Sequence, residues 1–259
     1  MILKRDEAFK AVCEFLTPRD DGTFDVGTAM FVSSPAGEDK VLCWIVTASH
    51  VAKTTNEKTI LVESNVDGKA LMLPLKLFGE LSEWKHHLVA DISCLKINPT
   101  QLNISFIKGH MFPYDHFDVS RECVSRDTEL TCIGFPNGLG TSGSFSPFTF
   151  RSFASSGFIT HNRADTKTPS EFFCLEHPSV GGYSGCPVFD LGYSVTGLIT
   201  QTKDKTRCHG IMHGTMSDNT GGKIAIVTPA FYLSDIIISI NKADSKDDMQ
   251  PPSISASYQ

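Results

Sequence analysis

Residues 181–190, GGYSGCPVFD, join a turn of small residues to a short apolar run. The run from Pro187 to Asp190 is typical of a buried strand, and glycines on either side of Ser184 allow a sharp bend. Such a turn can gather the N–H groups of Gly182 and Ser184 around one point, which is the geometry that an oxyanion requires. A lone G-x-S-G is more often an ordinary turn, so the interpretation depends on partners elsewhere in the chain.

A histidine and an aspartate occur in suitable settings. His50 follows a strand-like apolar run over residues 41–46, and Asp91 opens another over residues 91–97. The order along the chain is His50, Asp91, Ser184. The alternatives are a satisfied core histidine, a capping aspartate and a structural serine. The occurrence of all three together favours a shared site.

Three segments carry a resemblance to a known family. TASHV (47–51), DISCLKI (91–97) and GYSGCP (182–187) are similar to the histidine, aspartate and nucleophile motifs of trypsin-like serine proteases. CIGFPNGLG (132–140), SGFIT (156–160) and GKIAIVTP (222–229) resemble segments of the HtrA/Deg-type branch. The resemblance covers about residues 27–240. It implies an all-β fold of two six-stranded antiparallel barrels, with the active site between them and a short C-terminal helix.

The resemblance also implies a mechanism. Ser184 would attack a peptide carbonyl, His50 would take its proton and return it to the leaving amine, and Asp91 would hold the imidazole tautomer. The N–H groups of Gly182 and Ser184 would form the oxyanion hole. This chemistry needs no metal and no organic cofactor. Cys186, two residues past the serine, is interpreted as packing.

Two departures from the family limit what is carried over. Tyr183 stands where digestive relatives have an aspartate that pairs with a freed N-terminus, so activation by such a cleavage is not expected. Tyr183 would instead help position Gly182 or hold the loop closed until a partner or substrate binds. After Ile240 no segment is long enough for the peptide-binding domain that many HtrA/Deg proteins append.

The substrate pocket is less sharply defined by sequence. The resemblance places Pro178, Ser179 and Val180 on one wall and Thr200, Gln201 and Thr202 on the neighbouring strand. None is charged, which favours a small or medium, apolar or uncharged polar residue in the substrate. Residues 207–214 would reach the pocket rim, with their histidines on a surface hairpin, and His86 and His87 are expected in a solvated loop.

Composition excludes several other classes. The 259 residues carry a net charge of −6 and 41% hydrophobic residues, which disfavours nucleic-acid binding and allows a sizeable core. No stretch reaches the roughly 20 apolar residues of a membrane span, and the N-terminus lacks a signal-peptide pattern. The eight cysteines are scattered, without zinc-ligand spacing. They indicate reduced, buried thiols in a cytoplasmic protein.

The chain reads as one peptidase domain in four parts. Residues 17–100 would form the N-terminal barrel, 101–127 a linker, 128–241 the C-terminal barrel and helix, and 242–259 a disordered tail. Residues 1–16 form a short helix or an edge segment. The expected strands are 24–32, 41–46, 59–63, 71–77, 91–97, 129–133, 148–160 (bent or interrupted), 172–176, 187–190, 195–200 and 223–227, followed by a helix over 231–241.

The sequence therefore predicts a serine endopeptidase that acts on protein or peptide substrates. It would be narrow in specificity, or latent until an activating protein partner binds. Two alternatives remain: a catalytically silent protease fold that serves as a binding module, and a viral-type polyprotein-processing protease.

Overall fold

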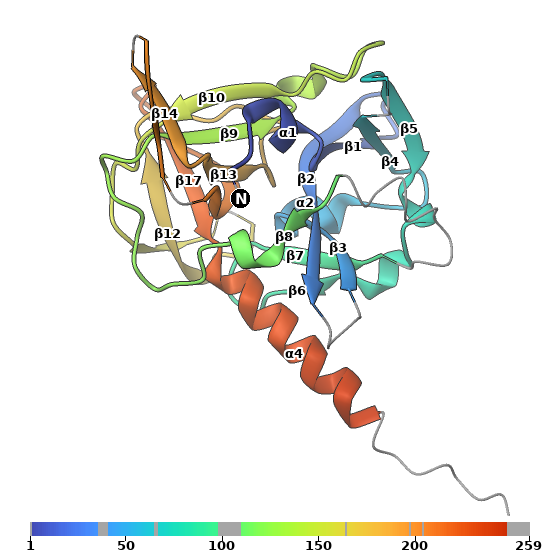
Figure 1. Cartoon of the computed structure of the whole chain (residues 1–259). Coiled ribbons are helices and arrows are strands. Elements are labelled where there is room, and N and C mark those ends of the chain that lie inside the picture. Colours follow the sequence, from blue (N-terminus) through green and yellow to red (C-terminus); the bar gives the residue numbers. More distant parts are fainter. Residues whose placement is uncertain are drawn as a thin grey trace, which may run out of the picture.

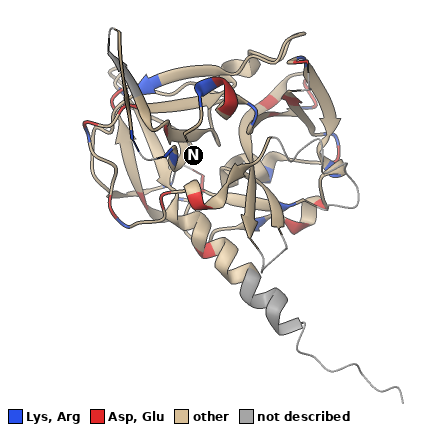
Figure 2. Cartoon of the chain, in the orientation of Figure 1, with Lys and Arg blue, Asp and Glu red and all other residues tan. Residues whose placement is uncertain are grey.

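The structure, a computed structural model, describes residues 2–35, 41–64, 67–97, 110–163, 165–196, 198–203 and 205–247. Two antiparallel sheets lie side by side, one built from the first half of the chain and one from the second (Figure 1). Helix α4 leaves the second sheet and extends away from the body of the molecule (Figure 1). Charged residues of both signs are interspersed over both halves (Figure 2).

The first sheet has the strand order β5-β4-β1-β2-β3-β7-β6, and β8 pairs in parallel with β2. Every second residue of its long strands, including Phe15, Phe31, Ile45 and Leu95, packs into one core. Because all these strands fill the same core, the sheet curls around it. Its elements are α1 (Arg5–Phe9), β1 (Val12–Pro18), β2 (Phe24–Pro35), β3 (Val41–Thr47), α2 (Ser49–Thr54), β4 (Ile60–Ser64), β5 (Ala70–Pro74), η1 (Leu75–Leu77), η2 (Leu81–Glu83), β6 (Lys85–His86), β7 (Ser93–Lys96), β8 (Phe112–Pro113) and η3 (Tyr114–His116).

The second sheet has the order β10-β9-β13-β16-β17-β12-β11. The chain just after β10 bonds back to β12: Ser155 N–H donates to Cys174 O (2.8 Å) and Glu176 N–H to Phe153 O (3.0 Å). The six strands from β10 to β12 therefore form a closed barrel. The elements of this half are β9 (Leu130–Gly134), η4 (Pro136–Gly138), β10 (Phe148–Ser152), β11 (Ile159–Asn162), β12 (Pro169–Leu175), β13 (Pro187–Asp190), β14 (Tyr193–Thr196), β15 (Ile199–Thr202), β16 (Arg207–Ser217), β17 (Lys223–Pro229) and α4 (Phe231–Asp247). Strands β14 and β15 pair with each other as a separate two-stranded sheet.

A third core joins the two halves. The outer faces of β2 and β3, with Met30 and Trp44, meet Phe135 and Phe189 of the second half. The first turns of α4 cover this core with Phe231 and its neighbours. The all-β, two-barrel architecture expected from the resemblance is confirmed.

Several local expectations differ from the structure. Residues 12–18 form an interior strand, β1, between β2 and β4, and not an edge segment. Of the expected strand 195–200, residues 195–196 belong to β14 and residues 199–200 to the antiparallel partner β15, so they do not form one continuous strand. Helix α4 continues to Asp247, into the expected tail 242–259, since no Gly or Pro interrupts residues 242–247. Residues 248–259 and 101–109 of the expected tail and linker lie outside the described residues.

Two further findings concern the chain as a whole. None of the described helices is long and apolar enough to cross a membrane. All eight cysteines lie in described segments and are free thiols; six are buried, and Cys43 and Cys123 are half-buried.

Candidate active site

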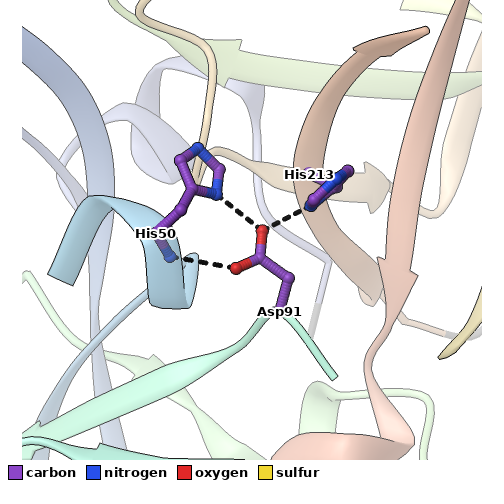
Figure 3. Close-up of side chains that lie close together, drawn as sticks. All are labelled: His50, Asp91 and His213. Carbon is purple, nitrogen blue, oxygen red and sulfur yellow. Dashed lines mark hydrogen bonds and ion pairs between the residues drawn. The ribbon is translucent and has the colours of Figure 1, made fainter. Parts of the chain in front are cut away.

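The register of the first sheet brings His50 and Asp91 together. Strands β3 and β7 are antiparallel neighbours with Thr47 opposite Ser93. His50 follows Thr47 in the second position of α2, and Asp91 precedes Ser93, so both leave the sheet at the same end. His50 N–H donates to Asp91 Oδ1 (3.0 Å), and His50 Nδ1 lies 2.7 Å from Asp91 Oδ2 (Figure 3).

Asp91 is fully buried and accepts four hydrogen bonds. Besides the two from His50, His213 Nδ1 lies 2.5 Å from Oδ2 and an Arg163 Nη lies 3.1 Å from Oδ1. Burial alone would raise the pKa of Asp91, but the hydrogen bonds from His213 and His50 hold it well below the usual range. Because the carboxylate is therefore ionised and can only accept, both imidazoles carry their proton on Nδ1.

Arg163 stands directly after β11 and is only 3% exposed. Its guanidinium also donates to Ala90 O (2.8 Å) and to Asp165 Oδ2 (2.6 Å). The bond to Ala90 O fixes the backbone just before Asp91, so Arg163 holds both the charge and the position of that residue.

Ser184 lies on the turn before β13. Gly182 and Gly185 have φ values of +92° and +87°, and a Cβ at either would meet backbone oxygen at 2.1 Å or less. Only glycine fits these positions. Ser184 Oγ donates to His213 O (3.3 Å). Among the described residues, no hydrogen bond joins Ser184 Oγ to the His50 ring.

Thr28 of β2 fastens this turn to the first half of the molecule. Its N–H donates to Ser184 O (2.8 Å) and its Oγ1 to Gly182 O (2.7 Å). Thr47 Oγ1 donates to Thr28 O (2.7 Å), so the strand that leads to His50 contacts the residue that holds Ser184.

The backbone beside Ser184 leaves two donors uncommitted. Among the described residues, neither Gly182 N–H nor Ser184 N–H has an acceptor. Gly181 O accepts from Asn137 N–H (2.7 Å), so the N–H of the same trans peptide, on Gly182, points away from Asn137. Tyr183 is buried, with its ring edge-on to Phe150 at 4.9 Å, and anchors the turn by packing.

A cavity of about 660 Å³ opens beside His50. It is bordered by the β11–β12 turn and by β16. The residues that line it are His50, His161, Asn162, Arg163, Asp165, Lys167, His213, Gly214, Thr215, Met216 and Ile226.

The structure places the two segments expected as pocket walls in different settings. The segment Pro178, Ser179, Val180 lies directly before the Ser184 turn, with Ser179 buried and bonded through its carbonyl to Thr215 Oγ1 (2.8 Å). Thr200, Gln201 and Thr202 are not part of the site; they lie in β15, on an exposed hairpin. The strand beside Ser184 is β16, because Gly185 N–H donates to Met212 O of β16 (2.8 Å) and Met212 N–H donates to Cys186 O (2.8 Å).

Sequence reasoning missed two residues of the site, His213 and Arg163. His213 was expected on a surface hairpin, but it is 7% exposed and contacts Asp91. His209 is similarly enclosed, with Nδ1 3.0 Å from Asp118. Arg163 carried no local signal. The histidine and glycine content of residues 207–214 obscured the strand, although Ile211 and Met212 are apolar enough to indicate one.

His50, Asp91 and His213 each offer one ligand atom, all within 4.8 Å of one another. The Nδ1–Oδ2 distances of 2.7 and 2.5 Å are those of hydrogen bonds. Ligands about 2.0–2.1 Å from a tetrahedral Zn²⁺ would lie about 3.3 Å apart. The Arg163 cation on the same carboxylate also opposes a second cation. The spacing thus fits hydrogen bonds between these groups better than shared coordination of a metal ion.

Comparison with known proteins agrees with this geometry. The family model of the trypsin-like peptidase domain matches residues 27–198, which is more than half of the chain and includes His50, Asp91 and Ser184. A comparison with curated proteins finds no match to the chain. The chain therefore belongs to the trypsin-like peptidase family.

Proposed function

We propose that this protein is a serine endopeptidase in which Ser184 is the nucleophile, His50 the general base and Asp91 the group that orients and stabilises the imidazole. The observation that carries the proposal is the buried, ionised Asp91 bonded to Nδ1 of His50 at 2.7 Å. That bond directs the basic Nε2 of His50 away from Asp91 and leaves it able to accept a proton. A peptidase domain of this family acts on peptide bonds, so the substrates are proteins or peptides.

The proposed reaction has two proton transfers. As Ser184 Oγ bonds to the substrate carbonyl carbon, its proton passes to His50 Nε2, and the imidazolium is stabilised by Asp91. His50 then gives this proton to the leaving amine as the C–N bond breaks, and a water molecule repeats the cycle on the acyl-enzyme. We assign the uncommitted N–H groups of Gly182 and Ser184 as the oxyanion donors.

Ser184 must turn before it reacts. Its Oγ donates to His213 O and not to His50. In unliganded active sites, catalytic hydrogen bonds are often formed only when substrate binds. A rotation about the Cα–Cβ bond of Ser184 would move the hydroxyl from the carbonyl to the imidazole, and substrate would favour the rotated state.

We also propose a preference for a small, uncharged residue on the acyl side of the cleaved bond. The support is the hydrogen bond from Thr215 Oγ1 to Ser179 O, which links the segment before Ser184 to β16 and narrows the space between them. No charge is present on Ser179 or Thr215 to receive a basic or acidic side chain.

The test combines a fluorophosphonate probe with a peptide series. The native protein and Ser82→Ala, a control at an exposed serine in η2, should label stoichiometrically, and Ser184→Ala should not. Peptides with Ala or Val before the cleaved bond should be hydrolysed faster than those with Arg or Phe. A folded native protein that neither labels nor cleaves any peptide would overturn the proposed activity and favour a silent binding module.

A further inference from the structure

The catalytic carboxylate proposed above serves two imidazoles. Asp91 Oδ2 is 2.7 Å from His50 Nδ1 and 2.5 Å from His213 Nδ1 (Figure 3). We propose that His213 is a positioning residue that shares Asp91 with His50, and that protonation of His213 weakens the support that Asp91 gives to His50. This inference rests on the proposed endopeptidase function.

The backbone of β16 is shaped to place this side chain. The β16–β17 register shifts between Met212, opposite Val227, and Gly214, opposite Ile226, which leaves His213 as the extra residue of a bulge. Bulges re-aim side chains and recur beside active sites. Met212 is fully buried in the barrel core, while His213 turns toward Asp91 across the molecule.

His213 contacts all three residues of the proposed triad. Its ring bonds to Asp91, its carbonyl oxygen accepts from Ser184 Oγ (3.3 Å), and its ring centroid lies 5.6 Å edge-on from that of His50. On another side the Phe172 ring lies 5.1 Å away. With these contacts the ring has little freedom, so its Nδ1–H holds the carboxylate that orients His50.

The charge on His213 matters because His50 must become an imidazolium in every catalytic cycle. Neutral His213 supplies an N–H to Asp91 without adding charge. Protonated His213 would place a second cation 5.6 Å from His50 on a single carboxylate. At this separation, the repulsion would lower the proton affinity of His50 about threefold at an effective dielectric constant of 80 and about a hundredfold at 20.

Other charged groups face the same space and also act on His213. Arg163 already pairs with Asp91 Oδ1 at 3.1 Å, and Asp165 compensates that guanidinium at 2.6 Å. His161 and Lys167 line the cavity that His213 also borders. Phe172 and Ile226, from β12 and β17, bring no charge. The nearest carboxylate available to His213 is therefore the one that His50 uses.

The test is a set of pH–rate profiles for the native protein, His213→Asn and His213→Leu. Asparagine keeps an N–H donor but cannot take up a proton, whereas leucine removes the donor. His209→Asn is the matched control, because this partly buried histidine on the same strand pairs with Asp118, outside the triad. Its pH profile should follow that of the native protein.

We expect the native acid limb to require two deprotonations and that of His213→Asn only one. His213→Leu should lower kcat about tenfold or more, with KM within about twofold, since the loss is in orientation and not in binding. If His213→Asn keeps the native profile, or His213→Leu keeps the native kcat, the inference is overturned. Should leucine prevent folding, the asparagine profile still decides.

An NMR titration of the imidazoles separates this inference from the proposed function. In His213→Asn, His50 should take up its proton at higher pH than in the native protein, because the competing cation is gone. This readout does not require turnover. An unchanged His50 titration overturns the inference whether or not the protein cleaves peptides, whereas a shifted titration in an inactive protein would overturn only the proposed function.

Discussion

We predict that Glu14 makes the stability of this protein fall as the pH rises toward neutrality. The residue lies in β1 and is fully buried. Its Oε2 accepts from Thr141 Oγ1 at 2.6 Å, while its Oε1 is buried with no hydrogen-bond partner among the described residues. Burial raises the pKa of Glu14 to about 7, against the opposing effect of the Thr141 hydrogen bond.

The size and the sign of the effect follow from linkage. Between the ordinary value of 4.5 and about 7, the folded state holds a proton on Glu14 that the unfolded state has released. The stabilisation is therefore complete below about pH 4.5 and is lost as the pH rises through 7. The difference between these two pKa values corresponds to about 3 kcal/mol of folding free energy, since each tenfold change in an equilibrium constant is worth about 1.4 kcal/mol.

The assay is urea denaturation of the native protein and Glu14→Gln at pH 5 and pH 8. Other groups also titrate in this interval, so the quantity of interest is the difference between the two proteins. The native protein should lose about 2.5 kcal/mol more than Glu14→Gln between the two pH values, because about 0.8 kcal/mol of the effect is already lost at pH 5. Glu57→Gln, at an exposed position, should follow the native protein. Equal losses in the native protein and Glu14→Gln would refute the reasoning.

Two further substitutions test the site. Gly182→Ala should lower kcat by about 10²–10³ with little change in KM, since a Cβ there would lie 2.1 Å from Phe135 O and displace an oxyanion donor; Gly181→Ala, whose Cβ would meet its nearest neighbour at 3.7 Å, is the control, and an equal loss in both would contradict the assignment. Arg163→Met should lower the free energy of unfolding by about 3–5 kcal/mol, because it leaves a buried carboxylate without its cation. Lys53→Met, which removes a half-exposed partner 3.6 Å from Asp165, should cost less than about 1 kcal/mol in the same urea titration, and equal costs would show that Asp91 does not depend on Arg163.

The parts of the site that could be predicted from sequence are those set by local chemistry. Each of His50, Asp91 and Ser184 stands beside a strand-like run, and the glycines around Ser184 are required by backbone angles that other residues rarely adopt. Turn chemistry and strand patterning act over a few residues, so they are visible in a single sequence. The order of the motifs then indicated the two-barrel fold.

The parts that could not be predicted depend on contacts between distant segments. Arg163 reaches Asp91 from the segment after β11, in the other half of the molecule, and no local pattern marks an arginine as buried. The bulge at His213 breaks the alternation by which a strand is recognised, so the sequence pattern does not indicate β16, and the resemblance instead places Thr200–Thr202 of the β14–β15 hairpin on the pocket wall. The residues of this part of the site are therefore set by the register between strands and not by the local composition of the sequence.

The hydrogen bonds of Thr28 would couple the proposed catalysis to the contact between the two halves of the molecule. Thr28 belongs to β2, yet it bonds to the backbone of both Ser184 and Gly182 in the second half. A separation of the halves that left both cores intact would still withdraw these bonds and move the nucleophile away from His50. Alignment of the proposed triad would therefore report on the contact between the halves, and a loosening of that contact would silence the site well before either half unfolds.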